Sequence, residues 1–209
     1  MSAVTEPTPP APTPPGAPAY AELAATIIQT RQQFGPKRLH EPGPSDAQIQ
    51  AFFLAAAAAP DHGQILPWRF VVVPGHRRDA LGEVFAAALR ERDPNADDHA
   101  LAEARDKAHR APFLALAIVR EHADDHPEIP AQERLVSLGC AIQNILLIAH
   151  ANGFGAGLVS GQALDTDGMR RLFRLRDGER AVCFLAIGTV QHRKPIRPRP
   201  RPEEFVSRL

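Results

Sequence analysis

The stretch PAQERLVSLGCAIQNILLIAHANG, residues 130–153, predicts the helix around which the chain folds. Pro130 suits the first position of a helix, and apolar residues then recur at helical spacing with little polar face between them. A helix of this kind is expected at the centre of a domain. It is also more apolar than the covering of one sheet requires, which indicates a second copy of the chain packing against it. Its apolar positions are Leu135, Leu138, Ile142, Ile145, Leu146 and Ala149.

Short apolar runs predict the sheet that this helix covers. FLALAIV (113–119) and AVCFLAIGTV (181–190) are strands of the kind buried on both faces, and RFVVV (69–73) is a shorter buried strand. Glycines at 153, 155 and 157 close the long helix and lead into LVSG. The expected fold class is therefore α+β, with long apolar helices against a sheet.

Further helices are predicted over residues 20–33, 76–92, 97–111 and 169–173. Ser45, with Gln48 three residues later, forms a capping box for another helix that must stop before Pro60. Residues 1–19 are rich in proline and are expected to be a disordered leader before a domain over 20–209. Prolines in 191–209 predict an extended C-terminal arm.

Composition limits the classes of function. The chain has 209 residues, 44% of them hydrophobic, and a formal net charge of zero, so no basic field would attract nucleic acid or an anionic membrane. Cys140 and Cys183 lie in apolar runs and are interpreted as small buried residues. The acidic loop at 121–126 is interpreted as solvated rather than as a metal site. A cytoplasmic protein acting on a small molecule is expected.

Two polar segments are candidates for chemistry. APDHGQILPWRF, residues 59–70, keeps Asp61 and His62 near Trp68, although Asp61 could simply cap a turn and His62 could pack under Trp68. A basic loop contains Arg31, Lys37 and Arg38, whose side chains could bind a phosphate or could be ordinary surface cations. Each segment alone is ambiguous.

Taken together and in order, five segments resemble the nitroreductase-like FMN-dependent oxidoreductase family, most closely its minimal branch. The resemblance runs from residue 23 to residue 209. It is carried by TRQQFGPKRL (30–39), the capped helix, APDHGQILPWRFVVV (59–73), the apolar helix with GFGAGLVSG (153–161), and FLAIGTV (184–190) before a basic arm. It implies a central mixed β-sheet flanked by helices, in one domain of an intertwined homodimer with FMN at the subunit interface.

The resemblance also implies the cofactor contacts. Residues near the end of the first helix would meet the flavin phosphate, and a cation a few positions on would meet its pyrimidine edge. Two further segments, the loop 60–67 and LVSG, would border the flavin ring. Gln32 and Gln33 replace the family's arginine and serine, and relatives carry arginine and glutamine where Ala58 and Leu66 stand. A close relative's arginine is missing at Val159, while Arg193 and Lys194 could complete the phosphate site. The implied contacts are Arg31, Gln32, Gln33, Lys37 or Arg38, Ala58, His62, Leu158, Val159 and Ser160.

The implied reaction is ping-pong: NAD(P)H passes a hydride to flavin N5, and a nitroaromatic, quinone or similar acceptor then takes the electrons. No catalytic side chain is required by that scheme. Three alternatives stay open. They are another flavin reaction such as enone reduction or reductive dehalogenation, a flavin-binding or sensing protein without turnover, and a structural or partner-binding domain whose proline-rich leader would be an SH3-type ligand. The physiological acceptor and the preference for NADH or NADPH are left open too.

Overall fold

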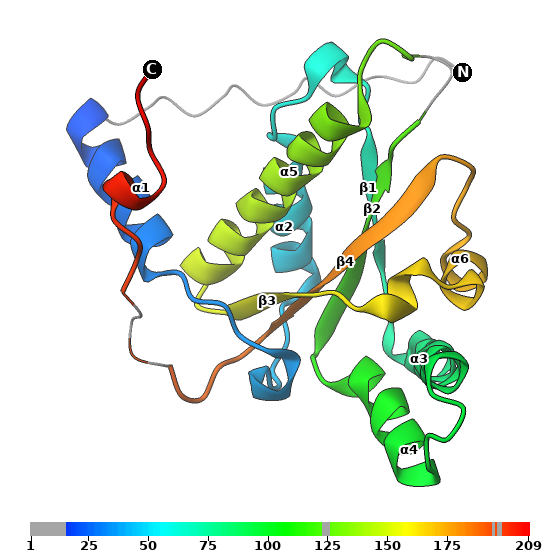
Figure 1. The fold of residues 1–209 in the computed structure, drawn as a ribbon. Coiled ribbons are helices and arrows are strands. Elements are labelled where there is room, and N and C mark those ends of the chain that lie inside the picture. The colour runs from blue at the N-terminus through cyan, green and yellow to red at the C-terminus, as the bar shows by residue number, and fades with distance from the viewer. Residues whose placement is uncertain (1–15, 123–125, 194, 196–197) are drawn as a thin grey trace, which may run out of the picture.

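A four-stranded antiparallel sheet with strand order β1-β2-β4-β3 forms the centre of the computed structural model, which describes residues 16–122, 126–193, 195 and 198–209 (Figure 1). The α+β class is confirmed. All three strand pairings are antiparallel, and the parallel contact in the described residues is an isolated bridge between Gln33 and Ala156. The implied mixed sheet is therefore mixed only at that bridge. The strands are β1 (Trp68–Val72), β2 (Phe113–Arg120), β3 (Gly155–Val159) and β4 (Glu179–Gly188).

The two central strands are the ones that the apolar runs predicted. β2 is buried over seven of its eight residues, and β4 is buried over most of its length. β1 is only partly buried, with Val72 39% exposed, so the prediction of a buried strand there was wrong. β1 is an edge strand, so it pairs with only one neighbouring strand and is covered less than a central strand.

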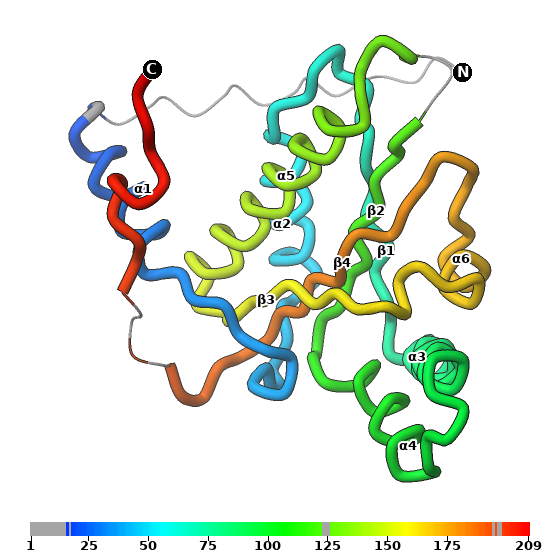
Figure 2. Tube along the Cα trace, in the orientation of Figure 1, coloured from blue at the N-terminus to red at the C-terminus, as the bar shows by residue number. Residues whose placement is uncertain are grey.

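β3 was not predicted as a strand, because its glycines have low β propensity. They are required by a close approach: the segment 31–36 runs beside β3 (Figure 2). A Cβ on Gly157 would overlap the carbonyl oxygen of Phe34, and one on Gly155 would overlap Val190. The backbone N–H of Phe34 donates to the carbonyl of Ala156 at 3.0 Å, which fixes the crossing.

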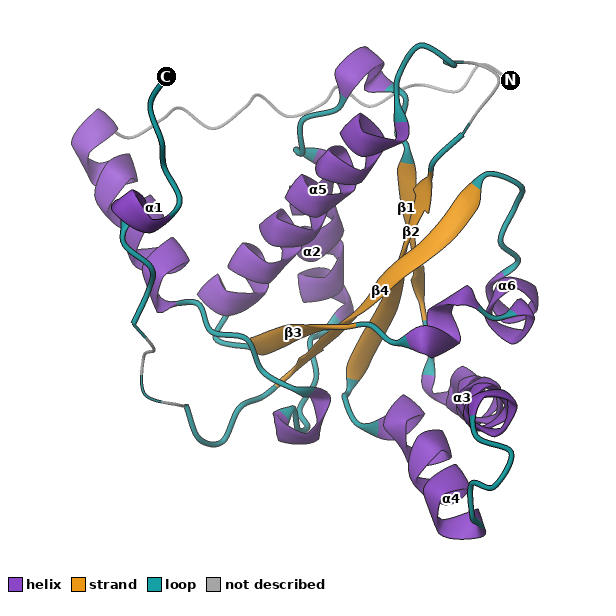
Figure 3. Ribbon diagram, viewed as in Figure 1, coloured by secondary structure: helices purple, strands orange, loops and turns teal. Residues whose placement is uncertain are grey.

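Helices cover both faces of the sheet (Figure 3). α5 (Ala131–Ala151) and α2 (Asp46–Ala57) lie on one face, where Asn144 Nδ2 donates to the Ala55 carbonyl at 3.0 Å. The predicted capping box starts α2: Gln48 N–H donates to Ser45 Oγ, and Ser45 N–H donates to Gln48 Oε1. The other face carries α3 (Arg78–Arg92), α4 (Asp98–Asp106) and α6 (Asp167–Phe173).

α5 is the central helix that its sequence predicted. By length and composition it is one helix that could cross a membrane, but its apolar side chains are used in the core against the sheet and α2. Leu135 and Val136 are exceptions, because they are 39% and 66% exposed in the first turns of the helix. Leu135 was predicted to belong to the apolar face of the helix, but its exposed side chain is available for a contact outside the core.

α1 (Ala17–Thr30) lies away from the sheet, beside the C-terminal segment (Figure 1). It starts before residue 20 and ends before the predicted residue 33, because Gln33 pairs with β3 instead of continuing the helix. The described part of the arm contains one short helix, and most of the predicted leader lies outside the described residues. Single 3₁₀ turns are η1 (Pro36–Arg38), η2 (His62–Gln64), η3 (Gly75–Arg77), η4 (Lys107–His109), η5 (Gln162–Asp165) and η6 (Pro202–Glu204).

Candidate functional site

The segment 31–36 links two unusual features of the surface. At its start Arg31 belongs to a group of cations, and at its end Pro36 lines a pocket. Between them Gln33 pairs with Ala156, and its side-chain Nε2 donates to the Leu158 carbonyl at 3.1 Å. Because β3 spans about 13 Å at 3.3 Å per residue, both features lie within reach of one extended ligand.

The first feature is a cationic cluster of Arg31, Arg193 and Arg199, with the imidazole of His150 beside Arg31 and Arg193. Arg199 Nη2 donates to the Arg31 carbonyl at 2.9 Å, and Arg193 Nη2 donates to the Gly153 carbonyl at 3.5 Å. Burial lowers the pKa of Arg31, and the neighbouring charge of Arg199 lowers it further. The cluster therefore holds like charges close together, with Arg31 partly buried and Arg193 and Arg199 exposed.

Nothing among the described residues neutralises this cluster. No carboxylate there forms an ion pair with its three arginines. Arg31 Nη1 is buried and lacks a hydrogen-bond partner within the described ranges. A buried guanidinium nitrogen without a partner carries a desolvation cost that a bound anion would remove. The cluster fits a phosphate group.

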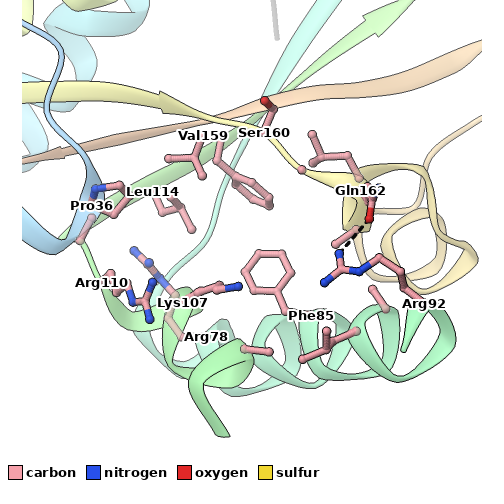
Figure 4. Close-up of a pocket in the computed structure, with 18 residues that line it drawn as sticks. Pro36, Arg78, Phe85, Arg92, Lys107, Arg110, Leu114, Val159, Ser160 and Gln162 are labelled. Carbon is pink, nitrogen blue, oxygen red and sulfur yellow. Dashed lines mark hydrogen bonds between the residues drawn. The ribbon is translucent and has the colours of Figure 1, made fainter. Parts of the chain in front are cut away.

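The second feature is a pocket of about 340 Å³ between β3, η5 and the helices α3 and α4 (Figure 4). Its apolar wall includes Phe85 and Phe184, whose rings meet edge to face with centroids 5.9 Å apart. Val159, the register partner of Phe184, and Ser160 line the pocket at the end of β3, opposite Phe85. A pocket of this size with aromatic walls suits a planar ring system.

Cations also surround this pocket, whereas no Asp or Glu lines it in the described part of the chain. Arg78 is committed to three backbone carbonyls, Arg92 to Gln162 Oε1 at 2.8 Å, and Arg110 to Asp106. Lys107 extends into the pocket, and its ammonium makes no hydrogen bond or ion pair with any described residue (Figure 4). Lys107 is thus the cation available to a ligand.

The sequence did not single out Lys107. It lies in a region predicted only as a polar helical piece, about fifty residues from β3, and its charge is ordinary for an exposed helix. Only the packing of α4 and η4 against α3 brings Lys107 to the pocket that Ser160 also lines. Lys37, which was predicted to meet a flavin, is exposed on η1 and does not line the pocket; Arg38 is likewise exposed.

The loop 58–67 lies at the opposite end of the molecule, near the start of α5 (Figure 1). Asp61 Oδ2 accepts from the Leu66 N–H at 2.7 Å and so holds the loop's shape. Gly63, Gln64 and Leu66 have positive φ angles of 71°, 54° and 44°, a conformation costly for the two that are not glycine.

His62 does not pack under Trp68, the alternative that the sequence allowed. Its side chain is 69% exposed, and its Nδ1 lies 2.7 Å from Glu133 Oε2. Trp68 is anchored instead by its Nε1, which donates to Ser137 Oγ at 3.0 Å.

The predicted site residues therefore form two groups. Arg31, Gln32, Gln33, Leu158, Val159 and Ser160 follow the segment 31–36 and β3. Ala58 and His62 belong to the distant loop. The two groups lie far apart within the chain.

Residues 38–189 match the sequence model of the Nitroreductase family. The chain belongs to the nitroreductase family. The match includes β3 and every lining residue of the pocket except Pro36, and membership supports an oxidoreductase function. Arg31, Arg193 and Arg199 lie outside the matched range, and the structure alone brings them together.

Individual nitroreductases agree with this membership. The chain is 32% identical over 166 residues to the "Putative NAD(P)H nitroreductase" of Haemophilus influenzae, covering 79% of this chain and 88% of that protein. The fold is similar to that of the "Nitroreductase-like Family Protein" from Bacillus cereus, with a TM-score of 0.73, 18% identity, and 88% and 95% of the two chains covered.

A second solved structure is a mutant of the FMN and NADPH-dependent nitroreductase NfnB derived from sphigopyxis sp. strain HMH. It has a TM-score of 0.69 and 19% identity, with 88% of this chain and 97% of that chain covered. At such identities the two solved structures establish the shared fold.

Proposed function

We propose that this protein is an FMN-dependent NAD(P)H oxidoreductase that reduces a nitroaromatic, a quinone or a similar acceptor. The observation that carries the proposal is the buried, unpartnered Nη1 of Arg31 in a cationic cluster that the segment 31–36 connects to a cation-lined aromatic pocket. FMN has the matching chemistry, a phosphate at one end and a planar aromatic ring at the other. The FMN and NADPH dependence stated for NfnB supports the choice of cofactor and reductant.

The chain's own residues would bind and orient this cofactor. Arg31, Arg193 and Arg199 hold the phosphate, and Val159 and Ser160 border the ring at the end of β3. Lys107 supplies positive charge where a reduced flavin carries negative charge. When bound, FMN supplies the chemistry of accepting a hydride from NAD(P)H and returning electrons to an acceptor. The side chains Phe85 and Phe184 exclude water from one wall of the pocket.

The proposed functional unit is a homodimer. Large apolar side chains are exposed on α2, on the loop 58–67 and at the start of α5, which suits a surface for a second copy of the chain. In such a dimer Ala58 and His62 of one chain would approach the pocket of the other, as the resemblance implied. The exposed residues are Leu54, Leu66, Leu135 and Val136, at 72%, 61%, 39% and 66%.

The cell compartment and the partners stay predictions from sequence: a cytoplasmic protein whose partners are a second copy and a small-molecule acceptor, with no nucleic acid or membrane. The described residues contain no cluster of three or more potential metal ligands, although part of the acidic loop 121–126 lies outside them.

Phosphate recognition by Arg31 tests the proposal. FMN and riboflavin affinities should be measured by fluorescence for the wild type, for Arg31→Ala, and for Arg171→Ala, an exposed arginine of α6 with no side-chain partner among the described residues. Arg31→Ala should weaken FMN binding by about 1.5 to 3 kcal/mol, because a charge-assisted hydrogen bond is lost. Riboflavin binding should not change, and Arg171→Ala should behave as the wild type. Equal loss for both flavins would remove Arg31 from the phosphate site, and absence of flavin binding by the wild type would refute the proposed function.

A further inference from the structure

His150, near the end of α5, lies inside the cationic cluster without an assigned role. Its Nε2 is 2.8 Å from Thr30 Oγ1, and that hydroxyl donates its own proton to the Thr26 carbonyl at 2.6 Å. The Thr30 oxygen must therefore accept, so Nε2 is the protonated nitrogen of the neutral ring. Nδ1 keeps a lone pair and has no hydrogen-bond partner among the described residues.

The charges around His150 are positive. Arg31 approaches from the residue after α1, and Arg193 approaches from the C-terminal arm; Arg199 lies beside Arg31. Burial lowers the pKa of His150 below its ordinary 6.5, and the charges of Arg193 and then Arg31 lower it further. At neutral pH the ring is consequently uncharged, with one nitrogen available.

We propose that His150 is the fourth member of the anion site, and that binding of a phosphate group by the arginines draws a proton from solvent onto its Nδ1. The proton makes the imidazole a second donor in the cluster while Nε2 continues to donate to Thr30. The identity of the phosphate as that of FMN rests on the proposed function. The coupling of anion binding to protonation does not.

The physical reason is the sign of the local field. A bound dianion neutralises the guanidinium charges that keep the ring uncharged, so the imidazolium becomes favourable. Because the pKa of His150 is higher in the complex than in the free protein, this contribution to affinity is complete below the free pKa. It disappears as pH rises through the pKa of the complex. Affinity should thus fall as the solution becomes more alkaline.

The direct test follows the His150 ring signal by NMR during a pH titration. Sulfate is the first probe, because it stays a dianion across the range, whereas the second ionisation of a phosphate monoester occurs near pH 6. Chloride at matched ionic strength is the control, and His150→Gln identifies the signal by its loss. Sulfate should raise the titration midpoint by roughly one pH unit, which corresponds to about tenfold tighter anion binding at low pH. This shift should vanish in Arg31→Ala.

A second measurement uses FMN. Calorimetry in two buffers of different ionisation enthalpy gives the protons taken up on binding, which should be fewer for His150→Gln, a variant that can still donate to Thr30. An unchanged midpoint with sulfate, or equal proton uptake by the two proteins, would overturn the inference. If FMN binds without these effects, the proposed function survives and the role of His150 does not. If sulfate shifts the midpoint but FMN fails to bind, the role of His150 survives and the proposed function does not.

Discussion

Lys107 is the pocket cation that we expect to interact with a negatively charged ligand. With its ammonium directed into the pocket and unpaired among the described residues, it should stabilise the negative charge of a reduced flavin. Lys107→Gln should therefore make the reduction potential of bound FMN more negative and slow its reduction by NAD(P)H. Lys37→Gln is the matched control. If a redox titration showed a changed reduction potential only in the Lys37 variant, Lys37 would be the cation near the flavin, as the resemblance implied, and Lys107 would be excluded.

Single residues were predictable where a motif is local. Arg31, Val159 and Ser160 were predicted from short segments; they lie along the segment 31–36 and β3, and their contact with a cofactor stays a prediction. Lys107 has no local signal, because its place in the pocket arises from the packing of α4 and η4 against α3. The backbone of Leu158 has a structural role, because its carbonyl accepts a hydrogen bond from Gln33. Its side chain is 39% exposed.

At the scale of elements, the crossing of 31–36 over β3 is the feature that fold and site share. Gly157→Ala should destabilise the protein by about 1 to 3 kcal/mol, because the new Cβ overlaps the Phe34 carbonyl and the crossing must shift. The same shift should weaken FMN binding. Gly75→Ala is the control: a Cβ there meets nothing within 4 Å and its φ is not positive, so the free energy of unfolding should change by less than about 1 kcal/mol. Thermal unfolding and FMN titration of both variants check this. A Gly157→Ala variant with unchanged stability and FMN affinity would contradict the role given to the crossing.

The elements themselves were largely predictable from periodicity and caps. α2 starts directly after the capping-box residue Ser45, as predicted, and α5 starts at Ala131, one residue after the predicted Pro130. β3 was missed because its glycines are selected by a neighbouring segment rather than by strand propensity. The end of α1 was misplaced for the same reason, since Gln33 pairs with Ala156 far along the chain. Local patterns do not report such non-local pairings.

At the scale of the molecule, the separation of loop 58–67 from the pocket requires a second chain if His62 is to meet the cofactor. Val136→Arg should shift the protein from dimer to monomer, because it places a charge at an exposed apolar position of α5. Light scattering after size exclusion measures the mass. Val72→Arg, on the edge strand β1 and 39% exposed, should stay dimeric. A wild-type monomer at micromolar concentration would contradict the dimer, and with it the role of His62.

The central claim is that this molecule holds FMN and passes reducing equivalents through it. The most direct measurement is the visible absorption spectrum of the protein after incubation with FMN and desalting, repeated without oxygen on addition of NADPH or NADH. We predict a retained flavin spectrum that bleaches with one of the two nucleotides and returns when an acceptor is added. A protein that retains FMN but never bleaches would be a flavin-binding protein without this turnover, and one that retains none would contradict the account.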